Sequence, residues 1–404
     1  MKRKFDIIVV GAGINGQVMS LAAARQGFSV ALIDQKKIVE DALKKFDGRA
    51  YAITFSSIKM LKNLDLWDKI SKTAQPVLNI KVSHGTLERG PSSASITFKN
   101  ADIEESPMAQ MVEDRFLRQC INSEIKKNNL VDVIEQKKVI QVIDYKNKKQ
   151  LILNDSSKIQ TSLVVASDGV KSPITKAMGI RKVGWKYKQS GLVCAVEHEY
   201  SSNNTAFQHF LPEGPLAILP LQNNIASIVW TENIQNAFTI SKMSDDEYLE
   251  ALHKRFGDFL GPLKLTGKRF SFPLSLSIAE KYVTNNFAVI GDAAHGYHPI
   301  AGQGLNAGLR DIAALMDVIT SARDRGENFS SHNVLNRYQE WRRFDNQTLG
   351  FATDYFNKMF SSYNPLLGSV RNFGMNIIER SGYGKRAFMK QAAGLNGDLP
   401  TLMR

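Results

Sequence analysis

The chain opens with an apolar run over residues 5–10, a glycine-rich turn, and then apolar residues spaced three or four apart. This order predicts a buried strand followed by a helix that ends near Gly27. A second apolar run over residues 29–33 predicts the next strand, which ends in Asp34. The inward face of the predicted helix carries Ile14, Val18, Leu21 and Ala24.

The same order of strand, turn and helix returns late in the chain. Residues 287–290 form an apolar run, and residues 291–304 form a turn rich in glycine and other small residues. A helix is predicted after it, because apolar residues then share one helical face. Free N–H groups at a helix N-terminus stabilise negative charge, so this turn is a candidate ligand site. That helical face carries Leu305, Leu309, Ile312, Leu315 and Ile319.

Between these two units the apolar positions alternate, as expected for sheets with one buried face. Helical spacing recurs in three places: residues 112–125, residues 245–256 and the chain after Ala322, where a helix is predicted over residues 334–343 before a long aromatic-rich stretch. Residues 133–145 and 150–154 predict a hairpin. The alternating segments are 77–83, 94–98, 191–200, 206–211, 216–221 and 225–231.

The first glycine-rich turn, residues 11–16, reads GAGING and matches the GxGxxG pattern. Gly11 would make the tight turn, Gly13 would admit a pyrophosphate, and Gly16 would let helix and strand pack closely. Asp34, at the end of the next strand, can accept hydrogen bonds from ribose hydroxyls. The unit alone does not separate FAD from NAD, but a second Gly/Asp motif far downstream favours FAD.

That second motif follows a buried strand over residues 163–166, where the chain reads Ser167-Asp168-Gly169. Asp168 can hold a ribityl hydroxyl, whereas Asp-Gly by itself is often only a turn. The other two motifs favour the ligand-binding interpretation. Arg49 can face a phosphate or the flavin edge, or be an ordinary surface arginine, and the sequence leaves both open.

These patterns predict an α/β protein with a Rossmann-like FAD-binding domain, an inserted mixed β-sheet substrate domain and a C-terminal helical region. The FAD-binding domain would be discontinuous, over residues 1–75, 106–178 and 279–330. The substrate domain would comprise residues 76–105 and 179–278, and the C-terminal helices residues 331–404.

Composition narrows the functional classes. The 404 residues are 43% hydrophobic and 23% charged, as in globular proteins, and the net charge of +13 would attract an anionic partner. The lysines occur in scattered pairs without interleaved aromatic residues, which argues against nucleic acid. Cys120 and Cys194 lie outside any metal-ligand spacing, so no metal is expected.

The N-terminal apolar run is too short for a signal peptide, and no run is long enough to span a bilayer. We therefore expect a cytoplasmic protein, with membrane contact, if any, peripheral and on the inner face. The basic, aromatic-rich tail leaves two interpretations open: a segment lying on an anionic membrane, or a helical cap on the nucleotide domain. Its apolar residues are Phe351, Tyr355, Phe356, Met359, Phe360, Leu366, Leu367, Phe373, Ile377 and Phe388, and its basic residues are Arg371, Arg380, Lys385, Arg386 and Lys390.

Three motifs now stand in order: GAGING at 11–16, SDG at 167–169, and GDAAH with HPIAGQGLNAGLRD over 291–311. Their order and residues resemble the para-hydroxybenzoate-hydroxylase type of flavoprotein monooxygenase. The last run, with GPLAILP at 214–220 and GLNGDLP at 394–400, is most similar to the ubiquinone-biosynthesis hydroxylase branch. Two positions depart from it, since many relatives carry Glu at Asp34 and Thr at Gly296.

The resemblance implies FAD as cofactor, NAD(P)H as co-substrate, and hydroxylation of a polyprenylated phenol by O2 through a flavin C4a-hydroperoxide. The helix opening near Gly302 would aim its N–H groups at the flavin N1/C2=O edge, where reduced flavin carries negative charge. His298 and Pro299 would shape the flavin pocket, and neither is predicted to be catalytic. The predicted cofactor-binding residues are Gly11, Ala12, Gly13, Ile14, Gly16, Asp34, Arg49, Arg115, Asp168, Gly169, Asp292, Gly302, Gln303, Gly304, Leu305 and Asn306.

The strands of the substrate domain supply a predicted substrate pocket, although most of its apolar residues are expected to face the core. Two alternatives to the quinone pathway stay open: a hydroxylase of a soluble aromatic compound, and a redox-inactive prenyl carrier on the same fold. Association with other quinone-pathway enzymes is expected, with no prediction of oligomeric state. The predicted pocket residues are Phe210, Pro215, Ile218, Pro220 and Trp230.

Overall fold

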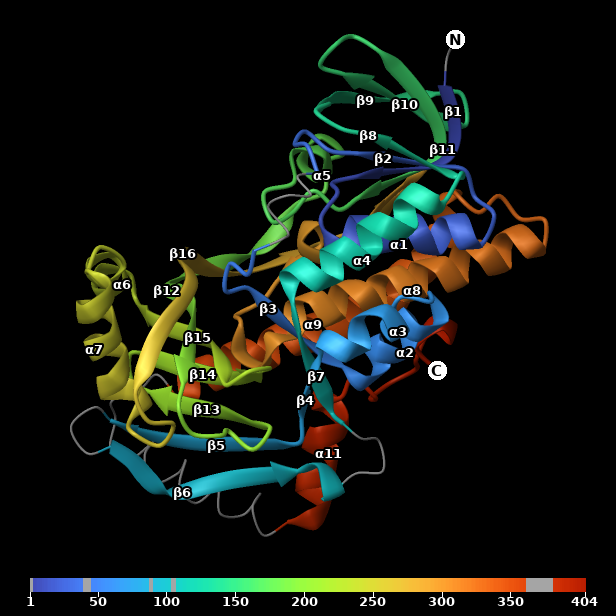
Figure 1. Ribbon diagram of the computed structural model, residues 1–404. Helices are drawn as coiled ribbons and strands as arrows, with labels where there is room; N and C mark the ends of the chain where they lie inside the picture. The colour runs from blue at the N-terminus through green and yellow to red at the C-terminus, as the bar shows by residue number, and fades with distance from the viewer. Residues whose placement is uncertain (1–2, 39–44, 87–89, 103–106, 361–380) are drawn as a thin grey trace.

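The computed structural model describes residues 3–38, 45–86, 90–102, 107–360 and 381–404. Within them the fold is mixed α/β, with two eight-stranded sheets, a three-stranded sheet, and helices at the C-terminal end of the chain (Figure 1). The predicted fold class is confirmed.

The first large sheet, called sheet A here, has the strand order β17-β18-β11-β1-β2-β8, and β10 and β9 continue from β11. Strand β1 pairs in parallel with β2 and β11, and β11 pairs in parallel with β18. The three strands that precede the glycine motifs are therefore neighbours, and their carboxyl ends meet at one edge. The strands are β1 (Arg3–Val10), β2 (Val30–Ile33), β8 (Val131–Ile134), β9 (Val139–Tyr145), β10 (Lys148–Leu153), β11 (Lys158–Ala166), β17 (Val283–Thr284) and β18 (Phe287–Val289).

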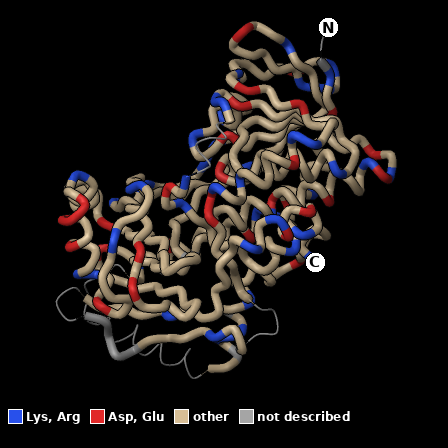
Figure 2. Tube along the Cα trace, in the orientation of Figure 1, with Lys and Arg blue, Asp and Glu red and all other residues tan. Residues whose placement is uncertain are grey.

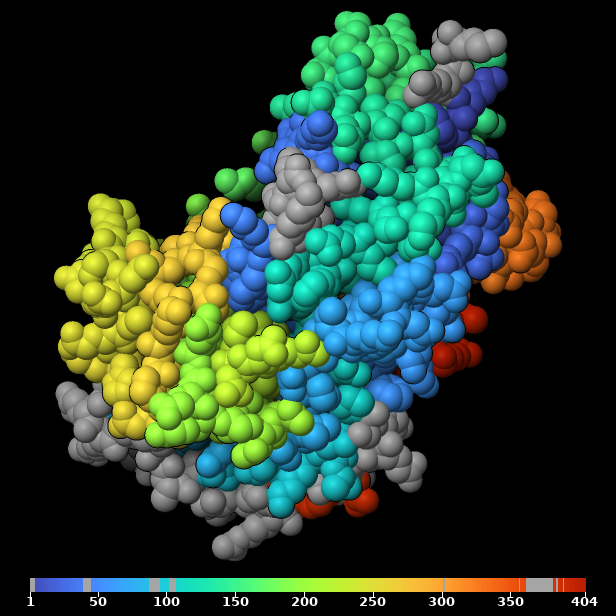
Figure 3. All heavy atoms as spheres, viewed as in Figure 1, coloured from blue at the N-terminus to red at the C-terminus, as the bar shows by residue number. Residues whose placement is uncertain are grey.

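Helices α1, α4 and α8 lie below sheet A (Figure 1) and close the main hydrophobic core. Most of α1 is buried, which fits its position between the sheet and α8. In the space-filling view, α2, α3 and α4 form one continuous surface over this part of the molecule (Figure 3). The helices are α1 (Ile14–Arg25), α2 (Phe55–Asn63), α3 (Trp67–Ile70), α4 (Asp114–Lys127), α5 (Pro173–Ala177) and α8 (Gln303–Asp324).

The second large sheet, sheet C, has the order β19-β16-β12-β15-β14-β13-β5-β6 and is antiparallel except where β13 meets β5. Helices α6 (Ile234–Ser241) and α7 (Asp245–Phe256) cover its outer face. The bounds of α7 agree with the prediction, and a capping box between Ser244 and Glu247 fixes its start. The strands are β5 (Asn79–Thr86), β6 (Gly90–Lys99), β12 (Lys182–His198), β13 (Thr205–Leu211), β14 (Gly214–Leu221), β15 (Ile225–Asn233), β16 (Leu263–Ala279) and β19 (His295–Gly296).

A small sheet of β3 (Ala50–Thr54), β7 (Ala109–Glu113) and β4 (Gln75–Val77) connects the two large sheets. Lys and Arg are spread over both parts of the molecule, with Asp and Glu among them, rather than gathered on one face (Figure 2). This distribution agrees with a solvated basic surface. Among the described residues, no group of His, Cys, Asp or Glu is arranged to hold a metal ion.

The tail begins with α9 (His332–Phe360), which runs well beyond the helix predicted over residues 334–343 and packs on α8. Helix α11 (Gly382–Ala392) follows, and its Met389 is fully buried. The described tail is therefore a helical cap. Within the described residues, no helix has the length and apolar character needed to cross a bilayer. Several tail residues singled out in the sequence lie outside the described ones: Leu366, Leu367, Arg371, Phe373, Ile377 and Arg380.

Candidate cofactor and substrate site

The turn between β1 and α1 is packed against backbone on one side, both its own and that of Ser167, and is open on the other. A Cβ on Gly11 (φ +104°) would lie 2.4 Å from the Ser167 carbonyl oxygen, and one on Gly16 would lie 1.8 Å from the Gly11 carbonyl oxygen. A Cβ on Gly13 would meet nothing within 4 Å. Gly13 therefore faces space that a ligand can use, while Gly11 and Gly16 serve the packing predicted for them.

Asp34 lies beside this turn, as the GxGxxG interpretation requires. Its Oδ2 accepts a hydrogen bond of 2.6 Å from the Ala12 N–H, and its Oδ1 accepts one of 2.8 Å from the Lys36 N–H. Helix α1 has no side-chain cap and no acidic residue in its first turn. The N–H groups around Gly13 and Ile14 can therefore receive a phosphate, with the helix dipole in its favour.

The N-terminus of α8 has the same character. Gly302, in the left-handed region (φ +61°), begins the helix without a side-chain cap, and a Cβ on Gly304 would meet nothing within 4 Å. Asn306 is engaged within the protein: its Oδ1 accepts from the Thr54 N–H (3.0 Å), and its Nδ2 donates to the Ala52 carbonyl (2.8 Å). Asn306 therefore anchors the turn to β3, and Gln303 and Leu305 follow Gly302 in the first turn of α8.

Asn15, which the sequence analysis did not select, joins the first motif to the third. A Cβ on Gly291 or on Gly308 would lie 2.3 Å from the Asn15 Nδ2 atom. Both glycines are thus required by the Asn15 side chain. The sequence shows glycine at positions 291 and 308, but no residue near either glycine in the sequence indicates that Asn15 packs against both.

Lys182, at the start of β12, ties the second motif to the third. Its Nζ donates to the Val170 carbonyl (2.8 Å) and to the Asp292 carbonyl (3.1 Å). Burial raises the pKa of the Asp168 carboxyl, although Ser172 and Lys182 favour its charged form, and its Oδ1 atom has no partner. Asp168, next to Gly169, is therefore poised to meet a ligand hydroxyl, and Lys182 is a member of the site that sequence reasoning missed.

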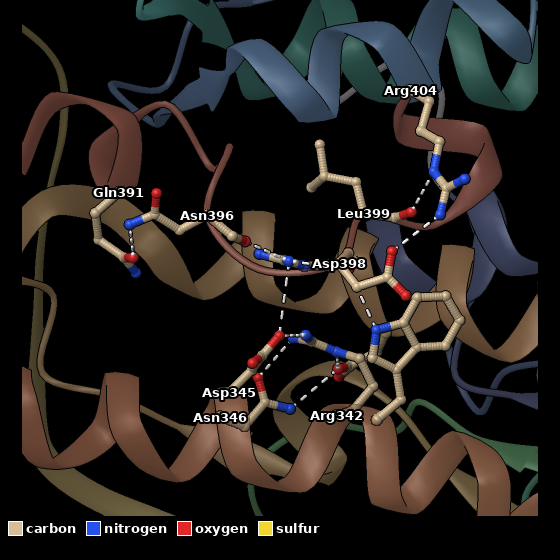
Figure 4. Close-up of polar contacts among 11 residues, drawn as sticks. Arg342, Asp345, Asn346, Gln391, Asn396, Asp398, Leu399 and Arg404 are labelled. Atoms are coloured by element: carbon tan, nitrogen blue, oxygen red, sulfur yellow. Dashed lines mark hydrogen bonds and ion pairs between the residues drawn. The ribbon is translucent and has the colours of Figure 1, made fainter. Parts of the chain in front are cut away.

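A buried ionic network holds the third motif in place, and Figure 4 shows the part of it in which Arg342 contacts Asp345 and Asn346. Asp311 Oδ2 accepts from the Gly291 N–H (3.0 Å) and contacts His295 Nε2 (2.6 Å), while its Oδ1 accepts from Arg342 Nε (2.9 Å). Burial alone would raise the pKa of Asp311, but His295, Arg342 and Asn346 lower it to about 2. Asp311 therefore stays charged and fixes the turn that carries Asp292.

Arg310, one residue earlier, holds the segment after α11 against α8. Its Nη2 donates to the carbonyls of Asn396 (2.6 Å) and Asp398 (3.3 Å), and the Trp341 indole N–H also donates to Asp398 (3.2 Å). We call residues 394–403 the C-terminal strap. The GLNGDLP run thus packs against the helix of the third motif.

The two arginines predicted to bind cofactor are both paired with acids. Arg49 Nη2 lies 2.7 Å from Asp47 Oδ2 and 3.1 Å from Asp114 Oδ2. Arg115 Nε lies 2.6 Å from Glu113 Oε2, and its guanidinium stacks on Phe116. Arg49 remains partly exposed despite these ion pairs. Cofactor binding by Arg49 and by Arg115 stays a prediction.

The five residues predicted to line a substrate pocket lie on two faces of sheet C. Ile218 and Trp230 pack under α6 and α7, where Trp230 contacts Tyr248. Pro220 has the same strand parity as Ile218, whereas Phe210 and Pro215 form a cross-strand pair on the inner face. One pocket cannot be lined from both faces. The prediction is therefore corrected for Ile218, Pro220 and Trp230, which face the outer cluster.

His298 lies between the α8 turn and the inner face of sheet C. It is buried, and its ring meets the Tyr187 ring edge-on with centroids 5.2 Å apart. Tyr187 in turn donates from its hydroxyl to Asp354 Oδ1 (2.9 Å) on α9. Pro299 follows His298 directly and leads into the turn at Gly302. The role of both residues in shaping a flavin pocket stays a prediction.

The residues fit FAD. Two uncapped helix N-termini with open glycines, at Gly13 and Gly304, suit a pyrophosphate and an electron-rich ring edge. The unpartnered Asp168 Oδ1 atom suits a ligand hydroxyl.

Comparison with known proteins agrees with this geometry. A family model described as FAD binding domain matches residues 4–346. The chain is 35% identical to ubiquinone hydroxylase UbiL of Rhodospirillum rubrum, covering 99% of this chain and 92% of that protein. It is 32% identical to 3-demethoxyubiquinol 3-hydroxylase of Escherichia coli, covering 96% and 98%.

Among solved structures, p-nitrophenol 4-monooxygenase PnpA of Pseudomonas putida DLL-E4 has the same fold, with a TM-score of 0.80 at 18% identity and coverage of 98% and 99%. The family resemblance seen in the motifs is confirmed. The chain therefore belongs to the FAD-binding family of flavoprotein monooxygenases, and it is an FAD-dependent monooxygenase that takes NAD(P)H as co-substrate.

Proposed function

We propose that this enzyme hydroxylates the aromatic ring of a polyprenylated phenol in ubiquinone biosynthesis. Bound FAD, once reduced by NAD(P)H, supplies the chemistry that activates O2. The chain's own residues bind the cofactor at Gly13 and Gly304, stabilise its negative charge with the α8 dipole, and exclude water from the reacting ring. The similarity to ubiquinone hydroxylases extends over nearly the whole chain, and it supports a role in this pathway.

The main support for this proposal is the inner face of sheet C, because its apolar and neutral side chains suit an uncharged, hydrophobic substrate. On β13, β14 and β15 the positions that share the inner face with Phe210 and Pro215 are apolar or neutral. None of those described positions is a lysine or arginine, so nothing there would pair with a ring carboxylate. The positions are Ala206, Gln208, Phe210, Pro215, Ala217, Leu219, Ser227, Val229 and Thr231.

The decisive experiment is mass spectrometry of lipid extracts from a strain that lacks this chain. The expected result is loss of ubiquinone and accumulation of a prenylated phenol with one hydroxyl fewer than the next intermediate. Complementation with the wild-type chain should restore ubiquinone, and complementation with Gly13→Ala, which blocks the open side of the FAD turn, should not. Normal ubiquinone in the deletion strain would refute the pathway and favour a soluble aromatic substrate.

We also propose that the enzyme touches an anionic membrane surface when it takes up this substrate, and that it works beside other quinone-pathway enzymes. Phe344, Phe351 and Tyr355 lie on one face of α9, and Phe344 is 74% exposed. The excess of basic residues in the chain would favour anionic lipid. Sedimentation with vesicles that contain phosphatidylglycerol tests this, and the triple serine variant is expected to stay in the supernatant.

A further inference from the structure

His298 presents two ring nitrogens that the protein itself leaves unpaired. The residue is 1% exposed, and neither Nδ1 nor Nε2 has a hydrogen-bonding partner. Buried polar atoms of this kind are rare in folded proteins, because the lost hydrogen bonds to water are not replaced. Because both unpartnered nitrogens lie next to the turn that begins α8, they indicate a ligand that forms the missing hydrogen bonds.

The position of His298 indicates which ligand. The residue lies in the turn that ends at Gly302, and its ring meets that of Tyr187 edge-on. Tyr187 contacts Asp354 of α9, and α9 also stacks its Phe360 on Phe210 of the inner face of sheet C. The imidazole therefore lies between the flavin turn and the inner face, where a reacting ring has to lie.

The groups around the imidazole fix its orientation. The Tyr187 hydroxyl donates to Asp354 Oδ1 (2.9 Å), and Asp354 Oδ2 lies 2.8 Å from Lys358 Nζ at the surface. Tyr297, which stacks its ring on His295 (4.8 Å), packs against the apolar cluster that contains Tyr187. This arrangement holds the plane of the Tyr187 ring, and through the edge contact it holds the plane of the His298 ring.

Burial lowers the pKa of His298 to about 4, against a smaller opposing effect of the Asp354 charge. The imidazole is therefore neutral near pH 7, with one N–H donor and one lone pair. A phenol hydroxyl, with a pKa of about 10 by analogy with tyrosine, keeps its proton beside such a group. The neutral ring can accept a hydrogen bond from the hydroxyl without taking the proton.

We propose that His298 recognises the ring hydroxyl of the substrate by accepting its hydrogen bond, with Tyr187 and Asp354 as positioning residues. This inference rests on the proposed function, since it requires a phenol as substrate. The hydrogen bond orients the ring against the cofactor turn. It also leaves more electron density on the ring than a free hydroxyl would, which favours attack by an electrophilic oxygen.

The test compares binding of 2-(3-methylbut-2-enyl)phenol with binding of its methyl ether, which lacks the donated proton. Both are titrated against the FAD-loaded enzyme by the change in flavin absorbance, so the readout is independent of turnover. The wild type is expected to prefer the phenol by about tenfold, the size of one hydrogen bond in a binding constant. In His298→Phe, which keeps a ring against Tyr187, the preference is expected to fall to within about twofold.

Three further variants separate recognition from packing. His298→Gln restores an acceptor and should recover part of the preference, and Tyr187→Phe should lower it because the Asp354 contact is lost. His209→Leu is the matched control: its pKa is also lowered to about 4 by burial, but its Nδ1 is already paired with Ser83 (2.9 Å). It should keep the wild-type preference.

A His298→Phe variant that takes up FAD and still prefers the phenol as the wild type does would overturn the inference. If His298→Phe does not take up FAD, an unchanged preference in Tyr187→Phe would contradict the positioning role and with it the proposal. A wild type that binds both probes equally refutes this inference alone. A wild type that binds neither probe refutes the proposed function itself.

Discussion

Arg342 offers a direct measure of what the buried network contributes. Its Nε lies 2.9 Å from Asp311 Oδ1, and neither side chain is more than 2% exposed. Arg342→Met leaves the Asp311 charge buried with fewer partners. Removing one partner of a buried ion pair costs about 3–5 kcal/mol. The lower end is expected, because Gly291, His295 and Asn346 still contact Asp311.

Arg337 is the matched control on the same helix. Its Nη2 lies 2.7 Å from Glu327 Oε2, but both side chains are substantially exposed. Exposed pairs of this kind contribute about 0–1 kcal/mol, since water and salt screen them. For a chain of this length, unfolding entropy of about 2 cal/mol/K per residue converts these values to a Tm loss of roughly 4 °C for Arg342→Met and about 1 °C for Arg337→Met.

The assay is thermal unfolding followed by circular dichroism, with and without FAD, for both variants and the wild type. The FAD dissociation constant is expected to rise in Arg342→Met as well, because Asp311 holds the Gly291 N–H and His295 in the third motif. If Arg342→Met melts within about 1 °C of Arg337→Met, the reasoning from burial is refuted.

Three further predictions follow from the same contacts. Gly13→Ala and Gly304→Ala should leave the Tm of the apoprotein within about 1 °C of wild type and weaken FAD binding at least about tenfold by flavin fluorescence, because the added Cβ meets only open space. Gly16→Ala should instead yield no folded apoprotein, since its Cβ would lie 1.8 Å from the Gly11 carbonyl oxygen. The stabilisation that Asp311 contributes is present above its unfolded pKa of about 3.9 and is lost as pH falls through its folded pKa of about 2. The Tm gap between wild type and Asp311→Asn should therefore narrow below pH 4 in calorimetry, and a constant gap would contradict this. Arg310→Gln should free the C-terminal strap, so that limited proteolysis cuts near residues 394–398 faster than in wild type, and an unchanged digestion pattern would contradict that contact.

Helices and strands with regular apolar spacing, and with capping residues or glycines at their ends, were predictable from the sequence. Helix α7 is the clearest case, because three acids follow Ser244 and an apolar stripe ends at Phe256 before Gly257. Helix α9 was predicted too short, because its polar residues Asn346 and Asp354 interrupt the apolar face while pointing inward to buried partners. Such residues resemble surface positions until their partners are known.

The prediction for Ile218, Pro220 and Trp230 was wrong for a related reason. Strand β14 is buried on both faces, so apolar residues occupy consecutive positions and alternation no longer separates inside from outside. The glycines of the candidate site were predicted, because their roles follow from local backbone geometry. The partners Asn15, Lys182 and Arg342 were not, since each acts on a segment far away in the sequence.

The C-terminal strap has a consequence for the order in which the enzyme matures. Arg310 donates to the carbonyls of Asn396 and Asp398, and Asp317 accepts from the Thr401 N–H (2.7 Å). These side chains of α8 therefore gain their partners only when the strap docks. During synthesis, about seventy residues after α8 leave the ribosome before the strap that covers its outer side. Cofactor loading is therefore expected to be a late step, and a fusion partner joined close behind the strap would disturb it more than one joined at the N-terminus.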